Sequence, residues 1–194
     1  MDSTPSAVTI RIATVADEPP LRVLIPRSAH ALSRGFYSDA ERDAAIQYVF
    51  GVDSQLIRDG TYLVAERDGE IVGCGGWSKR RTLFGGDQHK DVDDPLLDPK
   101  VDAARIRAFF VAPEFARQGV GGLLMRACAC AAFEADFRAL ELMATLPGVP
   151  LYAAYGFSAQ ENVVEVAPNG VRIPFVRMHR RLDSTNSTDV ISCR

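Results

Sequence analysis

Three glycines occupy four consecutive positions directly after a hydrophobic run, where a helix is expected to begin. They are Gly119, Gly121 and Gly122, in the stretch VAPEFARQGVGG, and LLMRACACAAFEADF follows them. Glycine weakens a helix interior by about 1 kcal/mol relative to alanine, so helix propensity does not explain them. The first N–H groups of a helix lack partners within the helix and bind anions, and glycine allows a phosphate to approach them closely. The pattern therefore predicts a phosphate-binding helix start, to which Arg117 adds a positive charge.

A purely structural explanation also exists, because a loop can need glycines only to turn tightly. Two familiar nucleotide motifs are excluded. The sequence contains no GxxxxGK[ST], and the dinucleotide pattern GxGxxG fails at its third glycine, where Leu124 stands. From the residues alone, a ligand site and a tight turn both remain open.

The elements before the glycines alternate along the chain. VTIRIA predicts a half-buried strand, and DEPPLRVLIPRSAHAL predicts a helix with Asp17 as its N-cap. Pro26 is expected to divide that helix into two short pieces. Ser38 and Glu41 form a capping box at the start of a second helix. TYLVAE and EIVGCGGW flank an Asp-Gly pair that predicts a hairpin.

The residues from 78 to 101 read as a long loop, and loops of that length are often functional. After it, ARIRAFFVAP predicts a central strand that leads into the glycines and the long helix. ALELMAT predicts another strand, GVPLYAAYG a short helix, and NVVEVAPNGVRIPFVRMH a final hairpin. The polar residues 183–194 predict a disordered tail.

Composition excludes several classes of function. The chain has 194 residues, a net charge of −3 and 47% hydrophobic residues, as in an average soluble domain. The charge gives no reason to expect nucleic acid or an anionic membrane as a partner. No apolar run approaches the roughly 20 residues that span a bilayer, and MDSTPSAVTI lacks the features of a signal peptide, which predicts a cytoplasmic protein. Neither the cysteines nor the histidines have metal-ligand spacing, so no metal is expected.

Two motifs point to one family. FFVAPEFARQGVGGLL closely resembles the central motif of the GCN5-related N-acetyltransferases (the GNAT superfamily), in which a strand ending V-x-P leads into a pyrophosphate loop R/Q-x-x-G-x-G/A. LYAAYGF resembles the second signature of that family, L-Y-x-x-x-G-F. The first position of the loop motif falls on Ala116, and Arg117 and Gln118 are the adjacent polar residues. The resemblance covers residues 8–182 and implies a single N-acetyltransferase domain.

The resemblance also implies a fold and a cofactor. The fold is of the α/β (α+β) class, with a mixed, mostly antiparallel sheet of about seven strands, about four flanking helices and a splayed strand pair. Acetyl-CoA would enter that splay as the co-substrate, without a metal. The residues implied to bind it are the backbone of Phe109, Phe110 and Val111 on the strand, and Arg117, Gln118, Gly119, Val120, Gly121 and Gly122 in the loop and helix start.

The implied reaction is direct attack of an amine on the thioester, with CoA leaving as a thiolate. Tyr152 matches the family tyrosine that protonates this thiolate, and Tyr155, three residues further on, is an alternative. Both can also be mere packing aromatics. No general base is assigned; the candidates are Glu141 and, in the long loop, Asp87, His89 and the aspartates of residues 91–94, which could attract a cationic amine.

Two functional classes follow from the resemblance. The first is an acetyltransferase that acts on a primary amine of a small molecule or a protein. The second is a non-catalytic sensor or regulatory domain that binds acyl-CoA. The sequence does not identify the acceptor, and it does not decide between a monomer and a homodimer.

Overall fold

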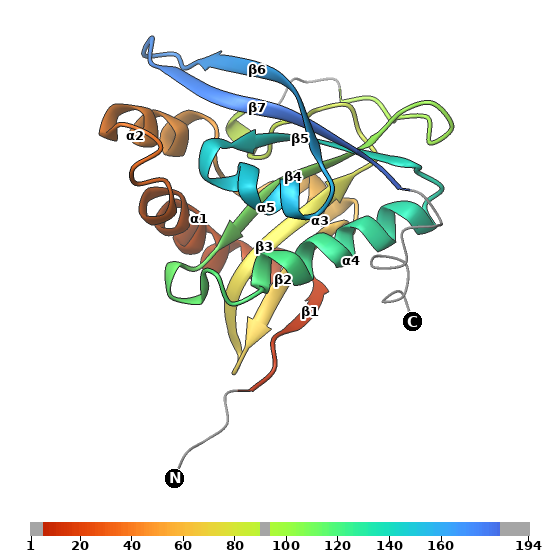
Figure 1. Ribbon diagram of the computed structural model, residues 1–194. Helices are drawn as coiled ribbons and strands as arrows, with labels where there is room; N and C mark the ends of the chain where they lie inside the picture. The colour runs from red at the N-terminus through yellow and green to blue at the C-terminus, as the bar shows by residue number, and fades with distance from the viewer. Residues whose placement is uncertain (1–5, 90–93, 183–194) are drawn as a thin grey trace.

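The computed structural model describes residues 6–89 and 94–182. Its centre is a seven-stranded sheet with the order β1-β2-β3-β4-β5-β7-β6 (Figure 1). All neighbouring strands are antiparallel except β4 and β5, which are parallel. The mixed, mostly antiparallel sheet predicted from the family resemblance is confirmed. The strands are β1 (Thr9–Ile12), β2 (Tyr62–Arg67), β3 (Glu70–Ser78), β4 (Ala104–Val111), β5 (Ala139–Thr145), β6 (Ser158–Val166) and β7 (Arg172–Arg181).

Helices cover both faces of this sheet. Alternate residues of β2 point to opposite sides, so Leu63 and Ala65 pack with α4, whereas Tyr62 and Val64 pack with α1. The described residues form five α-helices, where about four were expected, and two of these are very short. The helices are α1 (Glu18–Leu32), α2 (Asp39–Tyr48), α3 (Ser54–Arg58), α4 (Val120–Glu134) and α5 (Val149–Ala154).

The prediction that Pro26 divides the first helix is wrong. Pro26 lies inside one continuous helix, α1. Buried residues stand on both sides of it, among them Leu21, Leu24 and Ala29. The packing of both halves against the sheet offsets the one hydrogen bond that proline cannot donate. Asp17 occupies the N-cap position of α1 without capping it, because its carboxylate accepts hydrogen bonds from Thr14 and Arg11.

Other local predictions are confirmed. Ser38 and Glu41 form the capping box at the start of α2. Asp68 and Gly69 have positive φ angles of 53° and 79° in the turn between β2 and β3, the conformation that an Asp-Gly hairpin turn requires. The short α3, which is capped by the side chain of Asp53, is an element that the sequence analysis missed.

None of the helices in the described ranges is long and apolar enough to cross a membrane. Cytoplasmic location and the single-domain assignment of residues 8–182 stay predictions. The predicted disorder of residues 183–194 concerns a segment that lies outside the described residues.

Candidate functional site

The only parallel strand pair among the described residues separates after three residues. Residues 104–106 of β4 pair with residues 140–142 of β5. Beyond that point β4 stays paired with β3 as far as Val111, and β5 stays paired with β7 as far as Thr145. The strands therefore diverge and leave a split in the middle of the sheet (Figure 1), as the family resemblance implies.

A β-bulge in β4 lies at the start of the split. The register between β3 and β4 shifts there, because Gly76 pairs with Arg107 whereas Cys74 pairs with Phe110. Two residues of β4, Ala108 and Phe109, thus stand opposite a single residue of β3. Ala108 has a φ of 57°, which is uncommon for a residue other than glycine.

A buried tyrosine holds this bulge. The hydroxyl group of Tyr62 lies 3.4 Å from the carbonyl oxygen of Ala108 and 3.3 Å from the thiol of Cys74. The carbonyl of Ala108 and the N–H of Phe109 belong to one trans peptide, so they point in opposite directions. Because Tyr62 binds the carbonyl, the N–H of Phe109 points away from Tyr62.

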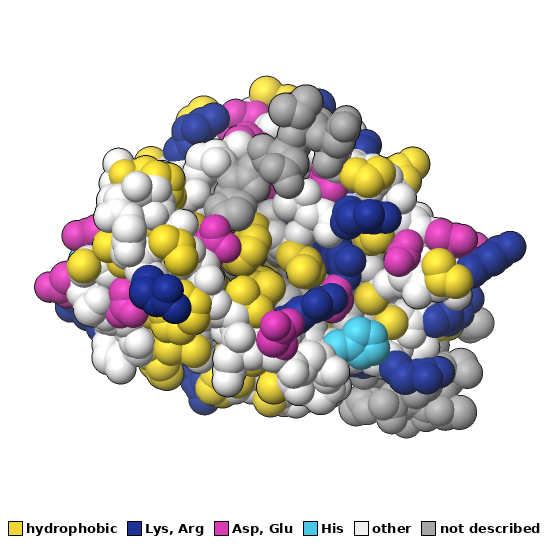
Figure 2. All heavy atoms as spheres, turned by 90° about the horizontal axis from the view of Figure 1, so that it is seen from above, with side chains coloured by type: hydrophobic (Ala, Val, Ile, Leu, Met, Phe, Trp, Pro, Cys, Tyr) yellow, Lys and Arg dark blue, Asp and Glu magenta, His cyan; other side chains and the backbone are white. Residues whose placement is uncertain are grey.

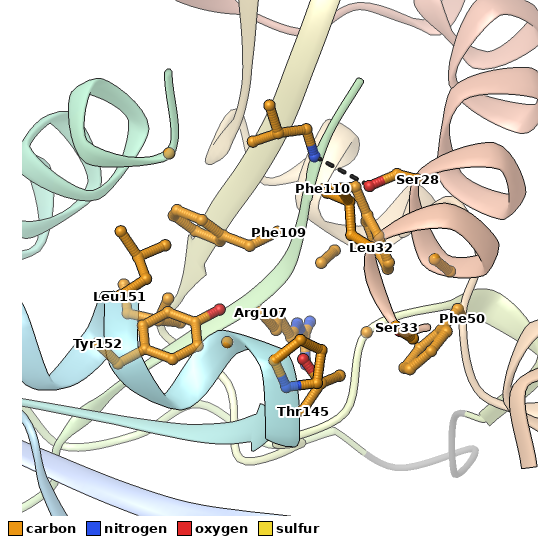
Figure 3. A pocket seen from close by; sticks show the side chains of 18 of the residues that line it. Ser28, Leu32, Ser33, Phe50, Arg107, Phe109, Phe110, Thr145, Leu151 and Tyr152 are labelled. Atoms are coloured by element: carbon orange, nitrogen blue, oxygen red, sulfur yellow. Dashed lines mark hydrogen bonds between the residues drawn. The ribbon is translucent and has the colours of Figure 1, made fainter. Parts of the chain in front are cut away.

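A cavity of about 610 Å³ occupies the split. The face seen from above in Figure 2 is hollowed near its middle, and hydrophobic side chains gather in that hollow. Figure 3 shows the cavity between Phe109, Leu151 and Tyr152 on one side and Ser28, Leu32 and Phe50 on the other. The lining comes from β4, β5, β7, α1, α5, the N-terminus of α4, the segments on either side of α2, and the loops between β3 and β4 and before α4.

The glycine-rich turn opens onto this cavity. Gly119 is the N-cap of α4 with a φ of 86°, and Arg117 also has a positive φ, 62°. In the described part of the chain, none of the backbone hydrogen bonds outside helices and strands is donated by the amide N–H groups of residues 118–122. Of the residues proposed from the sequence, the structure places in the lining Phe109, Phe110, Val111, Arg117, Gly119, Val120, Gly121 and Gly122, but not Gln118. The side chain of Gln118 instead donates a hydrogen bond to the carbonyl of Glu114.

Gly122 has a second reason to be glycine. A Cβ atom at this position would lie 2.0 Å from the hydroxyl oxygen of Tyr155. That hydroxyl group accepts a hydrogen bond of 2.8 Å from Arg126. The close approach of Tyr155 to α4 therefore requires Gly122, whether or not a ligand binds there.

Tyr152 and Tyr155 lie in different surroundings. Tyr152 is 9% exposed and lines the cavity, whereas Tyr155 is absent from the described lining and is bound to Arg126. The hydroxyl group of Tyr152 points into the cavity (Figure 3), and no described residue forms a hydrogen bond with it. Burial raises the pKa of Tyr152 well above its ordinary value of about 10, so the phenol stays protonated at neutral pH.

The backbone of β4 is not entirely free on the cavity side. The amide N–H of Val111 donates a hydrogen bond of 3.2 Å to the hydroxyl oxygen of Ser28 (Figure 3). Ser28 is buried in α1 and lines the cavity. A ligand that pairs with the backbone at Val111 has to displace or share this hydroxyl group.

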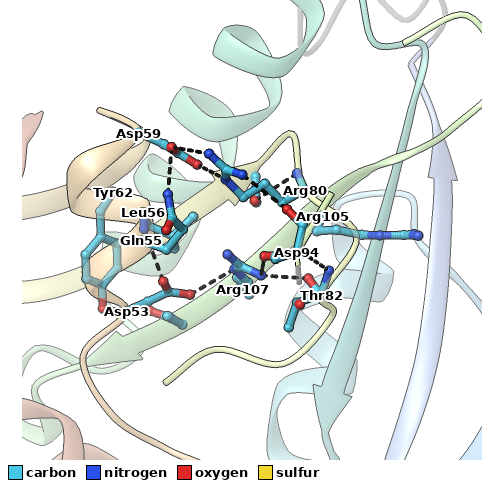
Figure 4. A network of polar contacts seen from close by, with 12 residues as sticks. Asp53, Gln55, Leu56, Asp59, Tyr62, Arg80, Thr82, Asp94, Arg105 and Arg107 are labelled. Atoms are coloured by element: carbon cyan, nitrogen blue, oxygen red, sulfur yellow. Dashed lines mark hydrogen bonds and ion pairs between the residues drawn. The ribbon is translucent and has the colours of Figure 1, made fainter. Parts of the chain in front are cut away.

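Arg107 directly precedes the bulge in β4 and contacts the loop that contributes to the cavity wall. The sequence analysis did not identify this residue. Its Nε lies 2.9 Å from Oδ2 of Asp53, and its Nη1 donates to the carbonyl of Thr82 over 2.8 Å (Figure 4). Asp53 also caps α3. Leu83 and Phe84, which follow Thr82, line the cavity. The ion pair is fully buried, so the loss of one partner would leave an unpaired charge in the protein interior.

The general-base candidates from the sequence are dispersed. Glu141 forms ion pairs with Arg105 and Arg177 and is not among the described lining residues. Asp87 accepts hydrogen bonds from the backbone and hydroxyl group of Ser54 at the start of α3. Both carboxylates therefore have structural partners.

The remaining base candidates lie in the long loop. Asp94 accepts a hydrogen bond from the amide of Thr82 and lies 3.7 Å from Arg107. The side chain of His89 and residues 91–93 lie outside the described part of the chain. Within that part, no cluster of side chains is able to hold a metal ion.

Comparison with known proteins gives one family. The model of the acetyltransferase (GNAT) family matches residues 27–157. No curated protein sequence matches this chain.

Solved structures share the fold at low sequence identity. A GCN5-related N-acetyltransferase from Rhodopseudomonas palustris superimposes with a TM-score of 0.68 at 19% identity, over 94% of this chain and all of the other. The PaiA N-acetyltransferase from Thermoplasma acidophilum, in complex with coenzyme A, gives 0.61 at 14% identity, over 91% and 99%. YncA from Salmonella typhimurium, a putative acetyltransferase with acetyl-CoA, gives 0.60 at 17% identity, over 92% and 96%.

Proposed function

This chain belongs to the acetyltransferase (GNAT) family, and we propose that it transfers the acetyl group of acetyl-CoA to a primary amine. One observation carries the proposal. The split between β4 and β5 brings three features to one cavity: the glycine-rich start of α4, the bulge in β4 and the hydroxyl group of Tyr152. Two structures of the same fold are described as complexes with coenzyme A or acetyl-CoA, which supports this choice of co-substrate.

The backbone amides at the start of α4 are suited to bind a diphosphate. The N–H groups of residues 118–122 and the positive end of the helix dipole provide hydrogen bonds and charge for it, and Arg117 lies beside them. The pantetheine arm would continue into the split along β4. There it would meet the amide of Val111, which Ser28 now occupies.

The bulge in β4 is suited to bind the carbonyl group of the thioester. The N–H of Phe109, directed away from Tyr62, is the candidate donor for the carbonyl oxygen. A donor fixed in a water-excluded site stabilises the negative charge that develops on this oxygen during attack. Phe109 itself lines the cavity, beside Tyr152.

The proton balance assigns Tyr152 as the general acid. The nitrogen lone pair of a neutral amine attacks the carbonyl carbon, and the C–S bond breaks as the carbonyl re-forms. The leaving thiolate takes the proton of the Tyr152 hydroxyl group, which burial keeps protonated. The surplus proton of the former amine nitrogen goes to the phenolate, or it goes to solvent while the phenolate takes a proton from solvent, and the enzyme returns to its starting state.

The experiment that tests the proposal combines the protein with acetyl-CoA and a panel of primary amines. We expect free CoA thiol to appear only when an amine is present, with a matching amount of N-acetylated product by mass spectrometry. Binding of acetyl-CoA without thiol release for any amine would instead identify a non-catalytic acyl-CoA-binding domain.

A further inference from the structure

One part of the cavity is walled by phenylalanine rings. Phe84, Phe175, Phe50 and Phe110 form a continuous row in which each ring meets the next edge to face. The centroid distances along the row are 5.4, 6.3 and 5.6 Å. The four residues come from four separate segments of the chain, and all of them line the cavity. We call these four rings the aromatic wall.

Further apolar side chains complete the surroundings of the aromatic wall. The further apolar lining residues in this part are Leu32, Phe36, Val49, Leu83 and Met143. The polar side chains interspersed with them are Ser33 and Thr145. A ligand body placed here would exchange water for carbon atoms over most of its surface.

No carboxylate side chain is among the described residues that line the cavity, so a bound cation would find no counter-charge there. The charged side chains of this lining, within residues 6–89 and 94–182, are Arg107 and Arg117, both positive. Arg107 is already paired with Asp53, which is not among the described lining residues. An ammonium group would lose hydration among these residues without gaining a described carboxylate, and such a loss favours the neutral form of an amine.

We propose that the acceptor is a small molecule that carries its primary amine on a single aromatic or branched aliphatic body. This inference rests on the proposed acetyltransferase function and specifies its substrate class. The cavity volume of about 610 Å³, which the thioester end of the co-substrate must share, fits a small-molecule site. A polyamine or another acceptor with a second cationic group would find no carboxylate among the described lining residues.

The test compares kcat/KM for 2-phenylethylamine and for 1,4-diaminobutane at pH 7.5 with saturating acetyl-CoA. We expect the aromatic amine to be favoured by about 10- to 100-fold, the range that apolar pocket contacts give. The value for 2-phenylethylamine should rise with pH in proportion to its neutral fraction.

Phe84→Ser removes the ring at the end of the aromatic wall. It should lower kcat/KM for 2-phenylethylamine about tenfold and leave the affinity for acetyl-CoA unchanged, and Phe84→Leu should restore part of the loss. Phe133→Ser is the matched control, because Phe133 lies in α4 against Arg138 and outside the described lining. The control should keep the preference for the aromatic amine.

Failure of this inference and failure of the proposed function would give different results. A preference for 1,4-diaminobutane, or an aromatic preference that Phe84→Ser leaves intact, would overturn the substrate class while acetyl transfer stands. Absence of acetylation with every amine, despite binding of acetyl-CoA, would overturn the proposed function and this inference with it.

Discussion

The ring of Tyr152 meets the ring of Phe109 edge to face, with centroids 6.4 Å apart and planes inclined by 68°. The two residues come from opposite sides of the split in the sheet. Phe109 belongs to the bulge of β4, whereas Tyr152 lies in α5, shortly after β5. This contact holds the phenol beside the bulge, so the candidate acid and the candidate carbonyl donor face one cavity.

Tyr152→Phe should lower kcat by about 100-fold or more, the usual contribution of a general acid. The ring and its contacts with Phe109 and Phe157 remain, so the dissociation constant of acetyl-CoA should hold. Steady-state kinetics and calorimetric titration measure the two quantities. Tyr155→Phe is the control, because the hydroxyl group of Tyr155 accepts a hydrogen bond from Arg126 and Tyr155 is not among the described lining residues. The kcat of this control variant should stay at the wild-type level. The acid assignment fails if the Tyr152 variant turns over normally or if the control shares the loss.

The pH dependence of kcat should lack an alkaline decline between pH 7 and about pH 10. A general acid works while protonated, so its activity is lost as the pH rises through its pKa. Burial raises the pKa of Tyr152 above the ordinary value of about 10, which moves that loss to still higher pH. A pH profile at saturating substrates checks this. A decline centred below pH 9 that disappears in Tyr152→Phe would contradict the raised pKa.

Tyr62→Phe should lower kcat about tenfold while the affinity for acetyl-CoA is retained. The change removes the hydroxyl group that holds the carbonyl of Ala108, and the peptide that carries the N–H of Phe109 loses its fixed orientation. Tyr62 does not line the cavity, so it acts through the bulge. Kinetics and titration, with a melting curve for each variant, separate this role from a loss of folding. A lower Tm with unchanged kcat would leave Tyr62 a structural role only.

Gly122→Ala should destabilise the protein, and Tyr155→Phe should relieve much of that effect. The new Cβ atom would lie 2.0 Å from the phenolic oxygen that the second substitution removes. The coupling measured by a double-mutant cycle in urea should therefore be favourable, by about 0.5–3 kcal/mol. Additive effects of the two substitutions would show that Tyr155 does not constrain this position.

Local signals in the sequence predicted much of the fold. The capping box at Ser38, the turn at Asp68 and the glycine-rich start of α4 each depend on neighbouring residues, and the structure contains all three. The cavity lining includes most of the residues proposed for the cofactor. Their roles stay predictions until a ligand is bound.

Long-range contacts were not predictable in the same way. The ion pair of Arg107 with Asp53 joins residues 54 positions apart in the sequence (107 − 53), and neither residue belongs to a recognisable motif. The aromatic wall is assembled from four distant segments. Pro26 shows the converse case, in which packing of α1 against the sheet outweighed a strong local signal.

The most direct test of the account is a calorimetric titration of wild-type protein and Gly121→Val with acetyl-CoA. Gly121 lies in the first turn of α4 and lines the cavity, and a Cβ atom there would meet the flexible end of Leu151 at 3.2 Å and the side chain of Val111 at an ordinary 3.8 Å. The variant should therefore fold, as should the control Ala131→Val, which adds bulk elsewhere in α4.

Wild type and the control should bind acetyl-CoA saturably at one site per chain. Gly121→Val should bind at least about tenfold more weakly, because its methyl groups obstruct the helix amides. The absence of binding to wild type at millimolar acetyl-CoA, or equal binding by a normally folded Gly121→Val, would contradict a co-substrate site in the split between β4 and β5.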